Sequence, residues 1–128
     1  MSSRYVRNLF RGWMLSLPVA FYDTENKVVR PVEPTWATLE FGIPAGRAYD
    51  YCGHQGETGE INLVFLGRQG VGDDEMLSLA DQCMDIFMAK VDPNNAMTLT
   101  NKGAPMVYSD SRNYFCVAVP VEYDYHPT

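Results

Sequence analysis

The chain has 128 residues, 46% of them hydrophobic, and a formal net charge of −6. This length predicts one domain, residues 1–128, with a core large enough to fold without disulfide staples. The acidic balance argues against nucleic acid as the partner of the whole surface. No stretch approaches the ~20 apolar residues of a membrane span, and the N-terminus does not have the pattern of a signal peptide.

The cysteines are odd in number and widely spaced, at Cys52, Cys83 and Cys116. This spacing argues against a disulfide framework and indicates a reducing compartment. Because Cys83 and Cys116 fall at apolar positions of their segments, we expect them to pack as small hydrophobes.

An amphipathic helix is predicted over residues 2–17, where Pro18 ends the pattern. Its apolar stripe consists of Tyr5, Val6, Leu9, Phe10, Trp13, Met14 and Leu17. Arg4, Arg7 and Arg11 form a row on the opposite side. Three interpretations of this row stay open: a solvated face, a contact with an acidic surface such as another copy, or a membrane-surface helix.

Two strands are predicted next, a short one over residues 19–22 and an alternating one over 36–41. The second carries Ala37, Leu39 and Phe41 on one face. Residues 42–59 hold several glycines and Pro44, and we interpret them as a flexible arm or an extended hairpin, a β-tongue.

The chain is organised around a strand, a glycine loop and a helix between residues 59 and 90. Residues 60–66 read as an inner strand, because Val64 and Leu66 make its second face partly apolar. The loop 67–72 carries three glycines, and Asp73 or Asp74 then offers a helix N-cap. The apolar stripe of the helix consists of Met76, Leu79, Ala80, Cys83, Met84, Phe87 and Val91.

Short extended pieces are predicted over residues 96–100 and 105–108, with a turn at 101–103, and a long strand over 114–123. Pro120 cannot donate to a ladder, so it marks an edge position or a bulge. The element order predicts an α+β fold: one two-layer domain in which two helices pack on one face of an antiparallel or mixed sheet.

We find no pattern of catalytic chemistry and predict that the protein is not an enzyme. Cys52 and His54 offer two metal-capable side chains, but a structural zinc site needs four. The G-x-x-G-x-G loop reverses the dinucleotide fingerprint, and Asp73, Asp74 and Glu75 would repel a phosphate at the helix N-terminus. No metal and no cofactor is therefore expected.

Motif order and spacing across residues 5–122 point to one family. The segments are Gly59-Glu60-Ile61-Asn62-Leu63-Val64-Phe65, Gly70-Val71-Gly72, Leu79-Ala80-Asp81 and Phe87. Together with the opening helix, the Val19-Ala20-Phe21-Tyr22 strand and the long tongue, they resemble the tail-terminator-like proteins of long-tailed bacteriophages.

The resemblance implies that the chain is a structural protein of the virion. Such subunits close into a homo-oligomeric ring, commonly a hexamer, on the end of the tail tube, where they stop tube polymerisation and form the joint to the head-completion complex. The implied partners are the chain itself, the tube protein, a head-completion or connector protein, and genomic DNA that passes through the lumen without specific binding, with no membrane. The implied location is the virion tail or neck, assembled in the host cytoplasm.

A closed ring needs two different self-contacting faces on each subunit. The interface candidates are Arg4, Arg7, Arg11, Arg68, Gly70, Gly72, Asp73 and Asp74. The arginine row is a candidate to meet Asp73, Asp74 and Glu75 of a neighbour. The loops 42–59 and 67–72 are candidate contacts with the next ring, and the alternative interpretation is that they are disordered surface loops. The alternatives are another neck or tail-completion subunit and a small-ligand-binding α+β domain.

Overall fold

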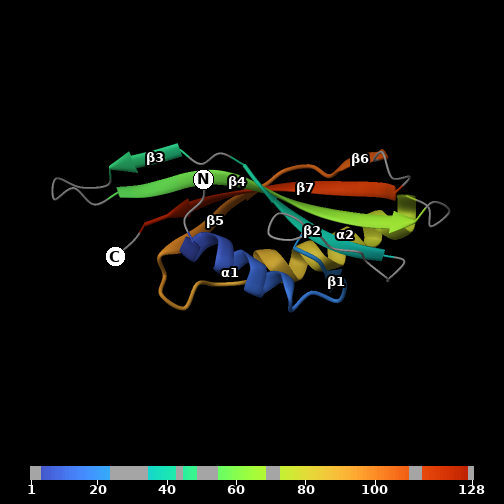
Figure 1. Cartoon of the computed structure of the whole chain (residues 1–128), viewed down its shortest axis with the longest axis horizontal. Helices are drawn as coiled ribbons and strands as arrows, with labels where there is room; N and C mark the ends of the chain where they lie inside the picture. The colour runs from blue at the N-terminus through green and yellow to red at the C-terminus, as the bar shows by residue number, and fades with distance from the viewer. Residues whose placement is uncertain are drawn as a thin grey trace.

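The computed structural model describes residues 4–23, 35–42, 45–48, 55–68, 73–109 and 114–126. These ranges contain the elements α1 (Arg4–Met14), β1 (Ala20–Phe21), β2 (Thr35–Phe41), β3 (Ala45–Ala48), β4 (Gln55–Arg68), α2 (Asp73–Met88), β5 (Met97–Lys102), β6 (Met106–Ser109) and β7 (Tyr114–Tyr125). The fold is α+β: a mixed sheet forms one layer, and both helices lie against the same face of it (Figure 1).

Two long antiparallel strands, β4 and β7, form the centre of the sheet. Each has two shorter strands along its outer side. β2 and β3 pair with successive stretches of β4, and β6 and β5 pair with successive stretches of β7. β1 joins β2 in parallel, whereas the other described pairs are antiparallel. β1 and β6 therefore lie on opposite edges at one end of the sheet.

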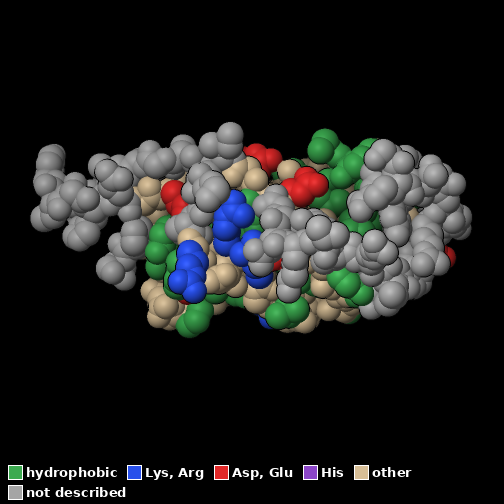
Figure 2. All heavy atoms as spheres, in the orientation of Figure 1, with side chains coloured by type: hydrophobic (Ala, Val, Ile, Leu, Met, Phe, Trp, Pro, Cys, Tyr) green, Lys and Arg blue, Asp and Glu red, His purple; other side chains and the backbone are tan. Residues whose placement is uncertain are grey.

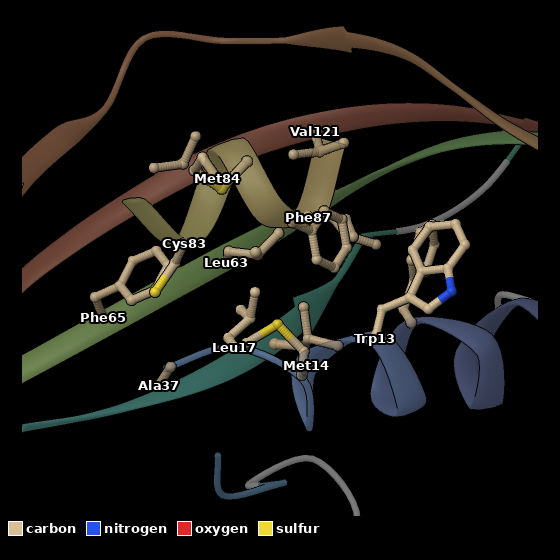
Figure 3. Packing of buried hydrophobic residues seen from close by; sticks show 14 of the residues in the cluster. Trp13, Met14, Leu17, Ala37, Leu63, Phe65, Cys83, Met84, Phe87 and Val121 are labelled. Carbon is tan, nitrogen blue, oxygen red and sulfur yellow. The ribbon is translucent and has the colours of Figure 1, made fainter. Parts of the chain in front are cut away.

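The main core lies between the helices and the sheet. Alternate residues of the inner strands, such as Leu63 and Val119, face the helices and are buried. Phe10 of α1 stacks on Phe87 of α2 with centroids 5.8 Å apart, and it meets Tyr123 of β7 edge to face at 5.3 Å. Figure 3 shows how side chains from both helices point into this space. Phe10 thus connects both helices to the sheet.

The opposite face of the sheet carries a second apolar cluster at the end where β1 and β6 lie. Its buried members are Trp36, Val64, Leu66, Cys116 and Ala118. Residues 61–66 of β4 pair with β2 on one side and with β7 on the other, which confirms the prediction that residues 60–66 form an inner strand with two apolar faces. The burial of Cys83 and Cys116 confirms that both pack as hydrophobes.

Both helices confirm the predicted stripes, with two differences at their ends. Helix α1 ends at Met14, and Leu17 is buried in the turn that follows. Helix α2 ends at Met88, so Val91 lies outside it and is exposed; its predicted core position is wrong. The helical phase no longer applies beyond Met88, because the chain turns away at Asp92.

Strand β4 is longer than predicted at both ends. It begins at Gln55 instead of 60 and runs through Gly67 and Arg68, which we expected in the glycine loop. Gly67 pairs with strands on both sides, and a β-carbon placed there would lie 2.7 Å from Sδ of Met76. The glycine therefore allows α2 to approach the sheet closely.

The first residues of β4 pair with β3 as an antiparallel hairpin, from Ala45↔Thr58 to Ala48↔Gln55. Of the two forms predicted within residues 42–59, the described part adopts the extended hairpin. Figure 1 shows this hairpin extending past the helix layer at one end of the molecule. We call it the β3–β4 hairpin.

Pro120 does not mark an edge strand, because β7 has partners on both sides. Its carbonyl accepts a hydrogen bond from the N–H of Gly103 at 2.8 Å. Since N–H and C=O of one strand residue point to the same side, the missing donor of Pro120 faces the break between β5 and β6. The predicted turn at 101–103 is also later than expected, since Asn101 and Lys102 still pair in β5.

Candidate functional site

The three arginines of α1 differ in their surroundings. Arg4 is exposed, whereas Arg7 and Arg11 are half-buried. Their guanidinium carbons lie 4.4 Å and 5.5 Å from the ring centroid of Phe41, within the range of cation–π attraction. Figure 2 shows the basic side chains gathered over α1. The row is therefore partly a packed feature and not simply a solvated face.

Arg11 also forms an ion pair within the chain. Its Nε lies 2.7 Å from Oδ2 of Asp23, and the two side chains are only 22% and 11% exposed. This pair joins α1 to the segment that follows β1. Because Arg11 has an acidic partner in its own subunit and Arg7 packs over Phe41, the exposed Arg4 is the strongest candidate of the three for contact with another molecule.

The acidic candidates lie at the start of α2. Asp73 is its first residue, and the side chains of Asp74 and Glu75 are exposed. Carboxylates in the first turn are favoured by the helix dipole. They are available to a partner, as the predicted pairing with a neighbouring copy requires. That pairing stays a prediction.

Only the first two residues of the predicted glycine loop, Gly67 and Arg68, belong to the described part of the chain. Arg68 is the last residue of β4. Gly70 and Gly72 lie outside the described residues, so the predicted contact of this loop with the next ring stays a prediction.

An acidic patch lies on the sheet face opposite the helices. The register places Glu60 beside Glu122 and Thr58 beside Asp124. These side chains border an open depression of about 440 Å³ that Thr100 also lines. Like charges directly opposite each other repel. The sequence shows these carboxylates as scattered, and only the strand register brings them together.

A polar contact closes the base of the β3–β4 hairpin. The Tyr123 hydroxyl donates to Oε2 of Glu57 at 3.1 Å, and both residues are buried. The ring of Tyr123 covers Gly59, where a β-carbon would lie 2.6 Å from the hydroxyl oxygen. This arrangement anchors the hairpin to the main core through Phe10, which packs on the same ring.

Sequence reasoning missed Asp92, a carboxylate that is only 1% exposed. It accepts hydrogen bonds from the Tyr5 hydroxyl at 2.6 Å and from the N–H groups of Asn94, Ala96 and Met97 at 3.0 Å each. Burial acts to raise the pKa of Asp92, but these hydrogen bonds outweigh it and hold the pKa below its ordinary value. The Asp-Pro-Asn-Asn sequence signals a turn with a capping carboxylate, but not the partner from α1.

Among the described residues, no group of three or more His, Cys, Asp or Glu side chains is placed to hold a metal ion. None of the described helices is long and apolar enough to cross a membrane. A comparison with protein-family models finds none that matches the chain, and a comparison with curated proteins finds no match either.

Proposed function

We propose that this chain is a virion assembly protein of the tail-terminator type. In this proposal it forms a ring, commonly of six subunits, on the end of a phage tail tube, stops tube growth and forms the joint to the head-completion complex. Genomic DNA passes through the lumen without specific binding. The protein acts by contact with copies of itself and with the tube, and it needs no catalytic residue.

The observation that carries the proposal is the β3–β4 hairpin. It extends past the helix layer of a two-layer α+β subunit (Figure 1), where it can contact a neighbouring subunit or ring. It is also anchored, because Tyr123 and Glu57 are buried at its base. A projecting element with a rigid base suits a protein that stacks on another ring.

The charge distribution supports a contact between unlike faces. Arg4 is exposed on α1, and Asp74 and Glu75 are exposed on α2. A contact between one subunit's basic face and the next subunit's acidic face is heterologous, and such contacts generate a ring when the rotation closes. Electrostatic complementarity of this kind favours correct register and rapid encounter.

The direct test is the oligomeric state across a concentration series, measured by light scattering together with negative-stain electron microscopy. We expect closed rings to appear as the concentration rises. A chain that stays monomeric at every concentration would contradict the proposal. Rings added to growing tail tubes should stop growth; rings that bind tubes without stopping growth favour another neck or tail-completion subunit.

Charge reversal tests the pairing itself. Arg4→Glu and Asp74→Arg should each weaken ring formation, and the double variant should restore it. Lys102→Glu, at an exposed position on β5, serves as the control for the change in net charge. If both single variants form rings normally, the pairing of Arg4 with Asp74 is wrong, but the proposed ring is not contradicted.

A further inference from the structure

Strand β6 differs from the rest of the outer edge along β7. The neighbouring β5 carries exposed polar residues on this edge, among them Asn101 and Lys102. In contrast, Met106, Val107 and Tyr108 of β6 are 57%, 46% and 40% exposed. Proteins commonly protect an edge strand with lysine or other charges. β5 is protected in this way, and β6 is not.

The opposite edge of the sheet is apolar as well. β1 is formed by Ala20 and Phe21, both partly exposed, and it pairs with β2. Within the described part of the chain, β6 pairs with β7 and β1 with β2, and no further strand lies on either. The two strands therefore form the described edges of the sheet at one end.

The strand directions of these two edges are complementary. β1 runs parallel to β2, and the β2–β4, β4–β7 and β7–β6 pairs are all antiparallel. β6 therefore runs opposite to β1. When a second copy is placed beside the first in the same sense, β6 of one copy and β1 of the next are antiparallel, the direction that short extended segments pair in most readily.

We propose that β6 pairs with β1 of a second copy, so that the sheet continues from one subunit to the next. This inference rests on the proposed ring and names one of its self-contacts. The two edges are different surfaces, so the contact is heterologous and suits closure by rotation. A few half-exposed side chains cannot supply the roughly 800 Å² per partner of a stable pairwise interface. The contact is therefore weak in a pair and effective in a closed ring.

The first test compares two surface valines. Val107→Lys protects the β6 edge with a charge, and Val91→Lys makes the same change at a 73% exposed position outside the strands. At a concentration where half of the unmodified chain is in rings, we expect Val107→Lys to lower the ring population at least tenfold and Val91→Lys to leave it unchanged. Circular dichroism of the monomers should show the same fold for both.

The second test uses cross-linking in a Cys52→Ser background with a short bis-maleimide. Ala20 and Met106 lie on the same face of the sheet, because their strand partners Trp36 and Ala118 both belong to the second apolar cluster. The pair Ala20→Cys and Met106→Cys should give a ladder of covalent oligomers, while Met106→Cys alone should give none. Dimers from Met106→Cys alone would show a two-fold β6–β6 contact and overturn the proposal. If rings still form with Val107→Lys and the cysteine pair gives no ladder, the β6–β1 contact is wrong although the proposed ring is right. If the unmodified chain is monomeric at every concentration, both the contact and the ring are wrong.

Discussion

The hydroxyl of Tyr5 donates a 2.6 Å hydrogen bond to Oδ1 of Asp92, a residue 87 positions away in the sequence. Tyr5 also stacks on Tyr125, with ring centroids 5.3 Å apart. Through Tyr5, helix α1 thus contacts both the loop after α2 and the last strand, β7. Because Asp92 caps the N–H groups of Ala96 and Met97 as well, it is the polar centre of this end of the molecule.

Replacing Asp92 should be strongly destabilising. Asp92→Ala leaves the buried N–H groups of Ala96 and Met97 without their acceptor, and each such group costs about 1–3 kcal/mol. We expect a loss of about 2–4 kcal/mol in the free energy of unfolding, measured by urea denaturation. Tyr5→Phe removes the hydroxyl that donates to Asp92 and accepts from Nδ2 of Asn94, but it keeps the ring on Tyr125 and should cost about 1 kcal/mol. Equal losses in the two variants would contradict the central role of Asp92.

The same carboxylate should make stability depend on pH. The pKa of Asp92 is lower in the folded chain than its ordinary value of about 4, since its hydrogen bonds outweigh burial. Its stabilisation is therefore complete above the unfolded pKa and is lost as the pH falls through the folded pKa. Urea midpoints measured from pH 6 down to pH 2.5 should fall, and Asp92→Asn should flatten the curve. An equally steep fall in Asp92→Asn would assign the effect to other carboxylates.

The described cysteines should be unreactive in the native protein. Burial raises the pKa of the Cys83 thiol to about 11, and Cys116 is also buried. Only the thiolate reacts rapidly. In a Cys52→Ser variant, we expect no thiol-reagent labelling in buffer and labelling of both residues in urea. Rapid labelling in buffer would show that the core opens locally.

Replacing Arg11 should lower the stability of the fold, whereas replacing Arg4 should not. Arg11 is paired with Asp23 and packs over Phe41, so Arg11→Met should lower the free energy of unfolding by about 1–2 kcal/mol. Arg4 is exposed, and Arg4→Met should change it by less than about 0.5 kcal/mol. A double-mutant cycle of Arg11→Met with Asp23→Asn measures the pair itself; a coupling energy near zero would leave packing on Phe41 as the reason for any loss.

Gly59 should not tolerate a larger residue. A β-carbon there would lie 2.6–2.9 Å from three atoms of Tyr123, so Gly59→Ala should cost about 1–3 kcal/mol through overpacking. Gly12→Ala is the control, because nothing lies within 4 Å of a β-carbon at that position, and it should be neutral or stabilising. A smaller loss from Gly59→Ala when Tyr123 is replaced by Leu would assign the cost to the ring.

Much of the fold follows from the sequence alone, because hydrophobic period is a local property. The 3.6-residue spacing of Val6, Phe10 and Trp13 predicts which side of α1 is buried, and two apolar faces predict that residues 60–66 lie inside the sheet. The apolar positions Cys83 and Cys116 were predictable in the same way. The local signal is weakest at the ends of elements, and for this reason the sequence pattern misplaces Gly67, Asn101 and Val91.

Only the tertiary structure decides which distant residues meet. Strand register sets Glu60 beside Glu122 and leaves β6 exposed at an edge. Chain packing brings Tyr5 to Asp92 and Arg11 to Asp23. These contacts join segments that are far apart in the chain. The hydrophobic periodicity of one segment shows which of its faces is buried, but it does not show which segment packs against that face. The sequence therefore predicts the helices and the buried faces of the strands, whereas only the fold determines which distant side chains share a surface.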